Sequence, residues 1–290
     1  MKQKKVFLTI GGSDPSGGAG IQADVKTAIR LGLYPCSVIT AITAQNSSEV
    51  TGIWPVPADQ IRAELRSVLE DLRPDAVKIG LLASREAVVA VAEVLESYQL
   101  QNVVLDPVIR PTLLPGKEDE DLVRDILELL FPIVTIATPN IREKEILERI
   151  ACMPLQSLCE ALLVTGGDAE GKDSVDTLFF HNFNSADHLP STAFPSINFN
   201  HSSTFDHSGI LPPPPEEDGI LACKEFRNKR IDTRNTHGSG CILSSAIACH
   251  LAKNPDIQSA VRHAIDFTHE ALKEAAGYRL TNGNYGPALI

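Results

Sequence analysis

Residues 6–29, VFLTIGGSDPSGGAGIQADVKTAI, place an apolar run, a glycine-rich loop and a helical pattern in direct succession. The run at 6–10 is typical of a buried strand, which Gly11 and Gly12 end. Apolar residues then recur at helical spacing, at Ile21, Val25, Ala28 and Ile29. A strand, a loop and a helix in this order form the unit from which parallel sheets are built.

The same alternation continues along the chain. Further runs of strand type lie at 36–43, 75–79, 103–105, 133–137 and 162–165, and helical stripes lie at 61–72, 88–95 and 243–251. This order predicts an α/β domain with a mostly parallel central sheet and helices on both faces. In such sheets ligands bind at the carboxyl ends of the strands. The polar or glycine residues at those predicted ends are Gly12, Asp14, Gly80, Asp106, Asn140 and Gly166.

Composition and charge exclude several functions. The chain has 290 residues, of which 43% are hydrophobic and 22% charged, and its net charge is −11. That charge argues against binding to nucleic acid or anionic membranes, whereas a small phosphate ligand remains compatible with it. No apolar run is long enough to span a bilayer, and the first residues do not resemble a signal peptide. We expect a cytoplasmic enzyme with reduced cysteines.

One segment interrupts the alternation. Residues 181–224 are rich in Ser, Asn, His and Pro and show no periodicity, which predicts a disordered insertion within a single domain spanning 1–290. The spacing of its histidines matches no known type of metal site, so we expect a solvated loop. These histidines are His181, His188, His201 and His207.

The loop at 12–20 leaves two interpretations open. It contains G-x-x-x-x-G, but Gly18 and Ala19 stand where a Walker A motif needs Lys and Ser or Thr. It is either a tight glycine turn that serves packing, or a backbone segment that approaches a small ligand. In the second case Asp14 and Asp24 are candidate hydrogen-bonding groups.

The stretch NTHGSGC at 235–241 precedes the predicted helix at 243–251. Its glycine turn therefore lies at a helix N-terminus, where unpaired N–H groups and the helix dipole favour an anion. The same field favours a thiolate at Cys241. A Cys–His nucleophilic pair with His237 and a glycine turn with a structural cysteine are the alternatives, and we favour the anion-binding turn.

Acidic and amide side chains follow two other predicted strands. Asp106 ends the run at 103–105, and Asn140 and Glu143 follow the run at 133–137. Carboxylates at strand ends beside an anion-binding turn are suited to an Mg²⁺–nucleotide site. The alternative for Glu143 is a solvated acid in the first turn of a helix, which the helix dipole stabilises.

These stretches together resemble the hydroxymethylpyrimidine/phosphomethylpyrimidine kinases, thiamine-pathway enzymes of the ribokinase-like superfamily. The resemblance extends over about 6–275 apart from the insertion. It rests on six ordered motifs: GGSDPSGGAGIQAD (11–24), SVITAITAQN (37–46), DAVKIG (75–80), VVLDPV (103–108), TPN (138–140) with Glu143, and DTRNTHGSGC (232–241). The end, GNYGPALI, is similar to the kinase module of fungal enzymes, and we expect the thiaminase-like domain that follows it there to be missing here.

The resemblance implies a ribokinase-like fold, the cofactors ATP and Mg²⁺, and two successive phosphorylations, first of 4-amino-5-hydroxymethyl-2-methylpyrimidine and then of its monophosphate. A homodimer is compatible with it. By position, the residues implied to hold the pyrimidine are Gly12, Asp24, Gln45, Leu81 and Val108. Those implied on the magnesium side are Asp106 and Glu143, and those beside the nucleotide are Asn140, Thr165, Gly166 and Gly167. The implied catalytic group is Cys241, with the anion-binding turn Gly238, Ser239 and Gly240, while His237 is expected to be structural.

The chain departs from the family pattern on the nucleotide side. Thr165 stands where the family has a lysine, the loop at 109–116 is shortened, and so is the stretch between Glu143 and Thr165. Two kinase-fold alternatives follow, a pyridoxal kinase and a catalytically weakened pyrimidine-binding paralogue. A Cys–His hydrolase is a more distant alternative.

Overall fold

The computed structural model describes residues 3–109, 118–167, 171–182, 220–281 and 286–288. Along them, strands and helices alternate as expected. The strands are β1 (Val6–Ser13), β2 (Tyr34–Gln45), β3 (Val50–Pro55), β4 (Ala76–Ile79), β5 (Val103–Leu105), β6 (Ile136–Ala137), β7 (Ala161–Val164), β8 (Asp173–Asn182) and β9 (Ile220–Lys229). The helices are α1 (Gly20–Arg30), α2 (Ala58–Asp71), α3 (Arg85–Tyr98), α4 (Glu120–Asp125), α5 (Ile141–Ala151), α6 (Ser239–Lys253) and α7 (Ile257–Ala276), with short helical turns at Ile126–Leu130, Phe131–Ile133 and Leu155–Ser157.

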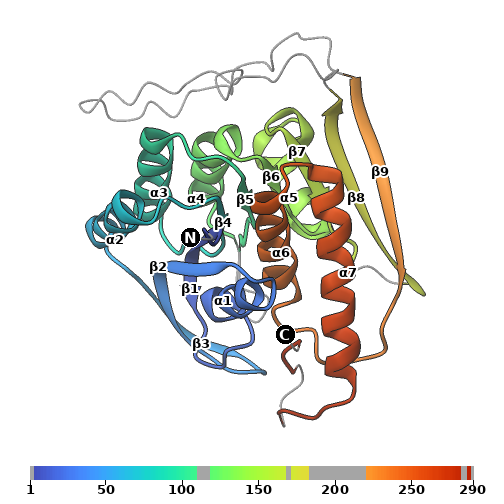
Figure 1. Ribbon diagram of the computed structural model, residues 1–290. Helices are drawn as coiled ribbons and strands as arrows, with labels where there is room; N and C mark the ends of the chain where they lie inside the picture. The colour runs from blue at the N-terminus through green and yellow to red at the C-terminus, as the bar shows by residue number, and fades with distance from the viewer. Residues whose placement is uncertain (1–2, 110–117, 168–170, 183–219, 282–285, 289–290) are drawn as a thin grey trace.

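The described strands form one sheet in the order β3-β2-β1-β4-β5-β6-β7-β8-β9 (Figure 1). The six strands from β2 to β7 in this order pair in parallel, whereas β3 at one edge and β8 and β9 at the other are antiparallel. The predicted mostly parallel sheet is confirmed, and the antiparallel additions lie at its two edges.

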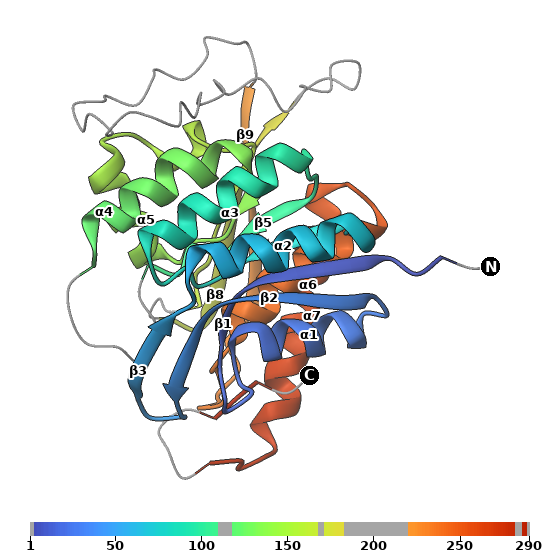
Figure 2. The ribbon, with the colours of Figure 1, turned by 90° about the vertical axis from the view of Figure 1, so that its left-hand side faces the viewer.

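Helices cover both faces of this sheet (Figure 2). Side chains alternate between the faces along each strand, so neighbouring residues enter different cores. In β1, Leu8 and Ile10 belong to the core beneath α2–α5, and Phe7 belongs to the core beneath α1, α6 and α7. The expected arrangement with helices on both faces is therefore confirmed, and each face has its own apolar core.

The carboxyl ends of the parallel strands meet along one edge of the sheet. The loop after β1, the segment after β4, and Asp106 after β5 all lie there, because these strands are parallel neighbours. Asn140 and Thr165, which follow β6 and β7, pair with each other in an isolated parallel bridge. The sheet thus brings residues far apart in sequence to a single edge, as predicted.

The boundaries predicted for the insertion were wrong. Residues 181–182 end β8 and residues 220–224 begin β9, and the two strands pair from Asp173↔Lys229 to Asn182↔Ile220. Both ends of the predicted insertion are therefore strand, because main-chain hydrogen bonds between antiparallel partners compensate for a polar composition. Residues 183–219, with three of the four histidines, lie outside the described residues.

The β8–β9 hairpin is part of a core. Phe226 of β9 is fully buried in the core beneath α6 and α7, and the guanidinium of Arg262 lies 4.5 Å from the centre of its ring. We expect Phe226→Ala to lower the free energy of unfolding by about 3–5 kcal/mol, through lost burial and a cavity. The neighbouring exposed Glu225→Ala should change it by less than about 0.5 kcal/mol. Urea unfolding of both variants measures this, and equal losses would contradict the packing.

Candidate active site

Two glycine-rich segments from opposite ends of the chain touch through their backbones. Gly238, the residue before α6, has φ 82°, and a Cβ there would overlap the carbonyl oxygen of Gly18. Gly20 has φ 58°, and a Cβ there would overlap the carbonyl oxygen of Gly12. A side chain at either position is excluded by backbone conformation and by space. The glycines therefore serve close packing, and this packing places the turn at 238–241 beside the first loop.

Asp14 organises the first loop from inside. Its carboxylate accepts hydrogen bonds from the N–H of Ser16 at 2.8 Å, the Ser16 hydroxyl at 2.9 Å and the N–H of Ala19 at 2.8 Å. Burial raises the pKa of Asp14, but hydrogen bonds from His237, Ser16 and Ala19 outweigh it and hold the pKa below its usual value. Asp14 is thus an ionised anchor of the loop.

His237 connects this loop with the end of β2. Its Nε2 lies 3.0 Å from Oδ2 of Asp14 and 3.0 Å from Nε2 of Gln45, the last residue of β2. Its backbone N–H donates to the carbonyl of Gly286, and its carbonyl accepts from the N–H of Ala288. The side chain predicted to hold the pyrimidine, Gln45, therefore lies next to the anion-binding turn. The ring nitrogen contacts Asp14 and Gln45, so the structure does not support a Cys–His pair.

Asp24, which the resemblance implies at the pyrimidine, has side-chain contacts within the protein. Its side chain is 0% exposed and lies beneath the loops, on the side of α1 that faces the sheet. Oδ2 accepts from the Thr9 hydroxyl at 2.6 Å and from Nζ of Lys78 at 3.0 Å, while Oδ1 accepts from the Ser245 hydroxyl at 2.8 Å. Both oxygens are therefore occupied within the protein.

Asp106 lies beside the first turn of α6. Its Oδ2 accepts a hydrogen bond from the Ser244 hydroxyl at 3.2 Å, and a Cβ at Gly240 would lie 3.9 Å from the same oxygen. Burial raises the pKa of Asp106, and Asp24 raises it further, against the opposing charge of Lys78. This carboxyl group is thus near the turn where an anion is expected, and its Oδ1 takes no part in the Ser244 contact.

Gly12 and Leu81 meet at the same edge of the sheet. A Cβ at Gly12 would lie 3.0 Å from Cδ2 of Leu81, and the Leu81 carbonyl accepts a hydrogen bond from Thr40. Val108 is partly exposed two residues beyond Asp106, and its N–H contacts the Asp106 carbonyl at 2.8 Å. Both leucine and valine side chains are therefore available to line an apolar surface there.

Cys241 lies in the first turn of α6 and is only partly exposed. Burial raises the pKa of its thiol to about 12, and the charges of Asp24 and Asp106 also raise it, whereas Lys78 and a hydrogen bond from the Gly20 N–H lower it. The expected thiolate is thus wrong for the resting protein, because loss of hydration outweighs the helix N-terminus.

Asn140 and Glu143 form a capping box at the start of α5. The N–H of Glu143 donates to Oδ1 of Asn140 at 2.8 Å, and the N–H of Asn140 donates to Oε2 of Glu143 at 3.0 Å. Both side chains therefore have a structural role in the helix N-terminus, which agrees with the alternative given for Glu143.

A guanidinium group lies over the predicted nucleotide loop. Arg230, which follows β9, donates to the carbonyls of Gly166 and Gly167, and the N–H of Gly166 donates to Oδ1 of Asp176 at 2.9 Å. Thr165 before them donates its N–H to the carbonyl of Pro139 at 3.0 Å. Thr165 pairs with Asn140 in an isolated parallel bridge, and among the described residues Arg230 is a cation that contacts this loop.

Comparison with known proteins identifies the family. Residues 14–199 and 221–287 match the family model for phosphomethylpyrimidine kinase. A hydroxymethylpyrimidine/phosphomethylpyrimidine kinase of Escherichia coli K12 is 35% identical over 294 residues, which cover 95% of this chain and 94% of that protein. The chain belongs to the phosphomethylpyrimidine kinase family.

Solved structures confirm the ribokinase-like α/β fold for this family member. The phosphomethylpyrimidine kinase of Clostridium difficile 630 superposes with a TM-score of 0.66 at 30% identity, covering 93% of this chain and all of that one. The pyridoxal kinase of Bacillus subtilis, solved as an ADP complex, superposes with a TM-score of 0.75 at 26% identity, covering 99% and 97% of the two chains.

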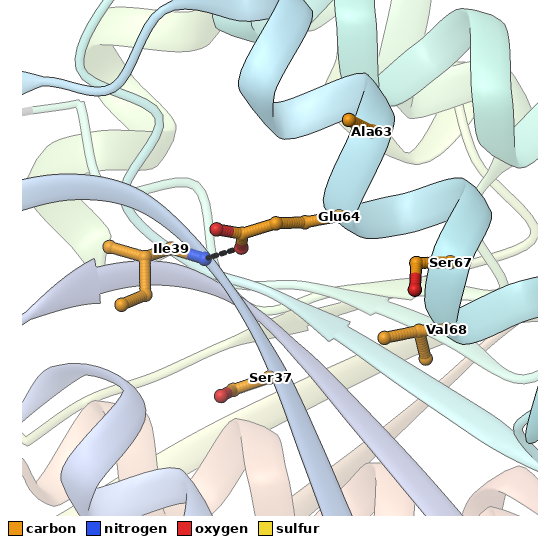
Figure 3. Close-up of a pocket in the computed structure, with 6 residues that line it drawn as sticks. All are labelled: Ser37, Ile39, Ala63, Glu64, Ser67 and Val68. Atoms are coloured by element: carbon orange, nitrogen blue, oxygen red, sulfur yellow. Dashed lines mark hydrogen bonds between the residues drawn. The ribbon is translucent and has the colours of Figure 1, made fainter.

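A hollow between β2 and α2 lies away from this kinase site (Figure 3). Within it, Glu64 of α2 accepts a hydrogen bond from the N–H of Ile39 at 3.1 Å, in the part of β2 that β3 does not pair with. None of the predicted site residues lines it. Its lining consists of Ser37, Ile39, Ala63, Glu64, Ser67 and Val68. Glu64 thus covers an open strand edge, and the hollow carries no group suited to phosphoryl transfer.

Potential metal ligands are sparse around the site. Among the residues that the structure describes, no three His, Cys, Asp or Glu side chains lie together in a way that could hold a metal ion. A magnesium ion in this kinase would therefore rest on one or two carboxylates and on phosphate oxygens, which is its usual preference.

No helix in the described part of the chain has the length and apolarity needed to cross a bilayer.

The sequence-based interpretation assigned no role to Lys78, Ser244 or Ser245. All three are buried at the site edge, where they contact Asp24 or Asp106. For Lys78 the sequence did contain a signal, because a single lysine interrupts the otherwise apolar strand AVKI at 76–79. A charge in a buried strand requires a partner, and the partner is Asp24.

The backbone contact at Gly238 should be measurable. Gly32 has nearly the same conformation, φ 83°, but a Cβ added there would have no neighbouring atom within 4 Å. We expect Gly32→Ala to cost about 1–2 kcal/mol of stability from conformation alone. Gly238→Ala should cost at least twice that in urea unfolding, since the new methyl group also overlaps Gly18. Equal losses would show that the two loops move apart easily.

Proposed function

We propose that this chain transfers the γ-phosphoryl group of ATP to 4-amino-5-hydroxymethyl-2-methylpyrimidine and then to the resulting monophosphate, as a step of thiamine biosynthesis. Family membership supports the reaction class. The observation that carries the proposal is the juxtaposition of Gln45, through His237, with the turn at 238–241. A group that recognises the ring and a turn that binds phosphate are thereby adjacent.

In the proposed reaction the substrate hydroxyl oxygen forms a bond to the γ-phosphorus while the bond from that phosphorus to the bridging oxygen breaks, which releases ADP. The hydroxyl proton passes to the sulfur of Cys241 after this thiol has released its own proton to solvent, because burial otherwise holds the pKa of the thiol at about 12. The first N–H groups of α6, at Gly240 and Cys241, point out of the helix and bind the phosphoryl oxygens, where charge is greatest in the transition state. Water is excluded by the packed glycine loops.

The residues present fit ATP and Mg²⁺. Asp106 supplies a carboxylate beside the phosphate-binding turn, and Glu143 is the second candidate ligand. When bound, Mg²⁺ neutralises phosphate charge and orients the γ-phosphoryl group. The nucleotide is proposed to lie along the edge formed by Asn140 and residues 165–167. Arg230, whose guanidinium lies over that loop, is the nearby cation on this side of a chain that has Thr165 in place of lysine.

Pyridoxal phosphorylation is the second candidate. It is favoured by the higher TM-score with the Bacillus subtilis pyridoxal kinase, 0.75 against 0.66 for the phosphomethylpyrimidine kinase. An ATP-consumption assay with the hydroxymethylpyrimidine, its monophosphate and pyridoxal side by side decides between them. Pyrimidine binding without ATP turnover would instead identify a weakened paralogue.

We further propose a single kinase domain, a cytoplasmic location and a homodimer. Analytical sedimentation tests the homodimer.

Removing the thiol should slow the chemical step. We expect Cys241→Ala to lower kcat by about 10²–10⁴, the usual contribution of a positioned acid–base group, with pyrimidine KM nearly unchanged. Cys152→Ala is the matched control, since this exposed thiol lies at the end of α5. A kcat near that of the wild type would remove Cys241 from the mechanism.

Replacing the ring-recognition amide should affect binding rather than chemistry. An amide both donates and accepts, which suits a pyrimidine edge with adjacent amino and ring-nitrogen groups. We expect Gln45→Leu to weaken pyrimidine binding by roughly 1–3 kcal/mol in calorimetry. Gln60→Leu, at an exposed position of α2, is the control. Unchanged affinity in Gln45→Leu would place the ring elsewhere.

A further inference from the structure

Lys78 is a buried cation that the proposed reaction does not yet use. Its side chain is 1% exposed, although it lies in β4 between Val77 and Ile79. Those neighbours enter the core beneath α2–α5, so the alternation of the strand directs Lys78 to the opposite face, toward α1 and α6. A lysine there requires compensation for its lost hydration.

Asp24 compensates for the charge and is itself held in place. Nζ of Lys78 lies 3.0 Å and 3.2 Å from the two carboxylate oxygens of Asp24. Hydroxyl groups of Thr9, from β1, and Ser245, from α6, donate to the same carboxylate. Burial lowers the pKa of Lys78, but the charge and hydrogen bonds of Asp24 outweigh it and raise the pKa above its usual value, so the lysine stays charged.

The ammonium group of Lys78 lies next to Gly80, at the carboxyl end of β4. A Cβ at Gly80 would be 2.7 Å from Nζ of Lys78, so the ammonium lies against the backbone that leads to Leu81. On the other side, Ser245, which contacts Asp24, and Ser244, which contacts Asp106, are consecutive residues one turn after Cys241. The Lys78–Asp24 pair and Asp106 therefore face the first two turns of α6, which packs on β4 and β5.

We propose that Lys78 is a positioning residue: a fixed positive charge, clamped by Asp24 beneath the first turns of α6, that stabilises negative charge at Cys241 and at the phosphoryl group held by the turn. The proposal rests on the proposed function for the identity of that phosphoryl group. A cation in a medium of low dielectric acts on neighbouring charge far more strongly than one in water. The charges around Cys241 support this role, because Lys78 is the ionised group that favours the thiolate, while both aspartates oppose it.

If the Lys78–Asp24 pair only stabilised the fold, replacing both residues would leave kcat unchanged in a folded protein. Removing one partner of a buried ion pair leaves an uncompensated charge, whereas replacing both with neutral groups of similar shape is often tolerated. The informative variant is therefore Lys78→Met combined with Asp24→Asn. The amide oxygen accepts from one of the hydroxyls of Thr9 and Ser245, and the amide NH2 group donates to the other. The control is Arg30→Met with Glu274→Gln, an exposed pair between α1 and α7.

The first readout is kinetic. We expect the Lys78→Met/Asp24→Asn variant to melt within a few degrees of the wild type and to lose about 10–100-fold in kcat, with pyrimidine KM changed less than about threefold. The control pair should match the wild type in all three values. A folded double variant with wild-type kcat would overturn the proposal, because the charge would then be dispensable.

The second readout needs neither ATP nor substrate. Alkylation of Cys241 by iodoacetamide at pH 8 is followed by mass spectrometry, with the exposed Cys152 of the same molecule as reference. The double variant is compared with Asp24→Asn alone, because Asp24 disfavours the thiolate and both variants lack its charge. We expect the ratio of the two rates to be at least threefold lower in the double variant, since the two variants differ only in the Lys78 cation, which favours the thiolate. An unchanged ratio would overturn the proposal. If the wild type fails to phosphorylate any pyrimidine, the proposed function fails while this ratio still tests Lys78.

Discussion

The contact between the backbones of Gly18 and Gly238 is the constraint on which the site depends. It joins the loop after the first strand to the turn before α6, although the two are 220 residues apart. Only glycine permits both the positive φ of Gly238 and the approach to a carbonyl oxygen. Because His237 and Cys241 flank that turn, the contact also sets where the imidazole meets Gln45 and where the thiol meets Gly20.

The titratable residues at the carboxyl-end edge of the sheet fall into two groups with different roles. Asp14 and Asp24 occupy their oxygens with internal donors, so they hold the first loop and the Lys78 charge in place. Asp106 and Cys241 lie beside and within the first turn of α6, where we propose that the phosphoryl group binds. A buried ion pair is weak evidence for stability, since an apolar pair of similar volume is often as stable. The location of the Lys78–Asp24 pair beneath the first turns of α6 is therefore better explained by the electrostatic role that we propose for it than by a contribution to folding.

Periodicity was enough to predict the parallel sheet, because its strands are short apolar runs that end at glycine or polar residues. It did not predict β3, β8 or β9, which lie at the sheet edges, where main-chain pairing adds to the burial of a few side chains such as Phe226. It also placed Ile29 on the buried face of α1, where the side chain is 60% exposed. In the site, the motifs indicated the loops correctly, but only tertiary contacts show that Asp24 is internal and that Glu143 caps a helix.

The two structural likenesses bear differently on substrate choice. The backbone matches a pyridoxal kinase with a TM-score of 0.75 and a phosphomethylpyrimidine kinase with 0.66, whereas the sequence family is the latter. Substrate choice in such folds depends on a few side chains rather than on the path of the backbone. The side chain that we propose recognises the ring here is Gln45, which His237 connects with Asp14. An amide beside the turn that we propose binds phosphate is suited to a hydrogen-bonding ring edge, and for this reason we propose the pyrimidine as substrate although the TM-score is higher with the pyridoxal kinase.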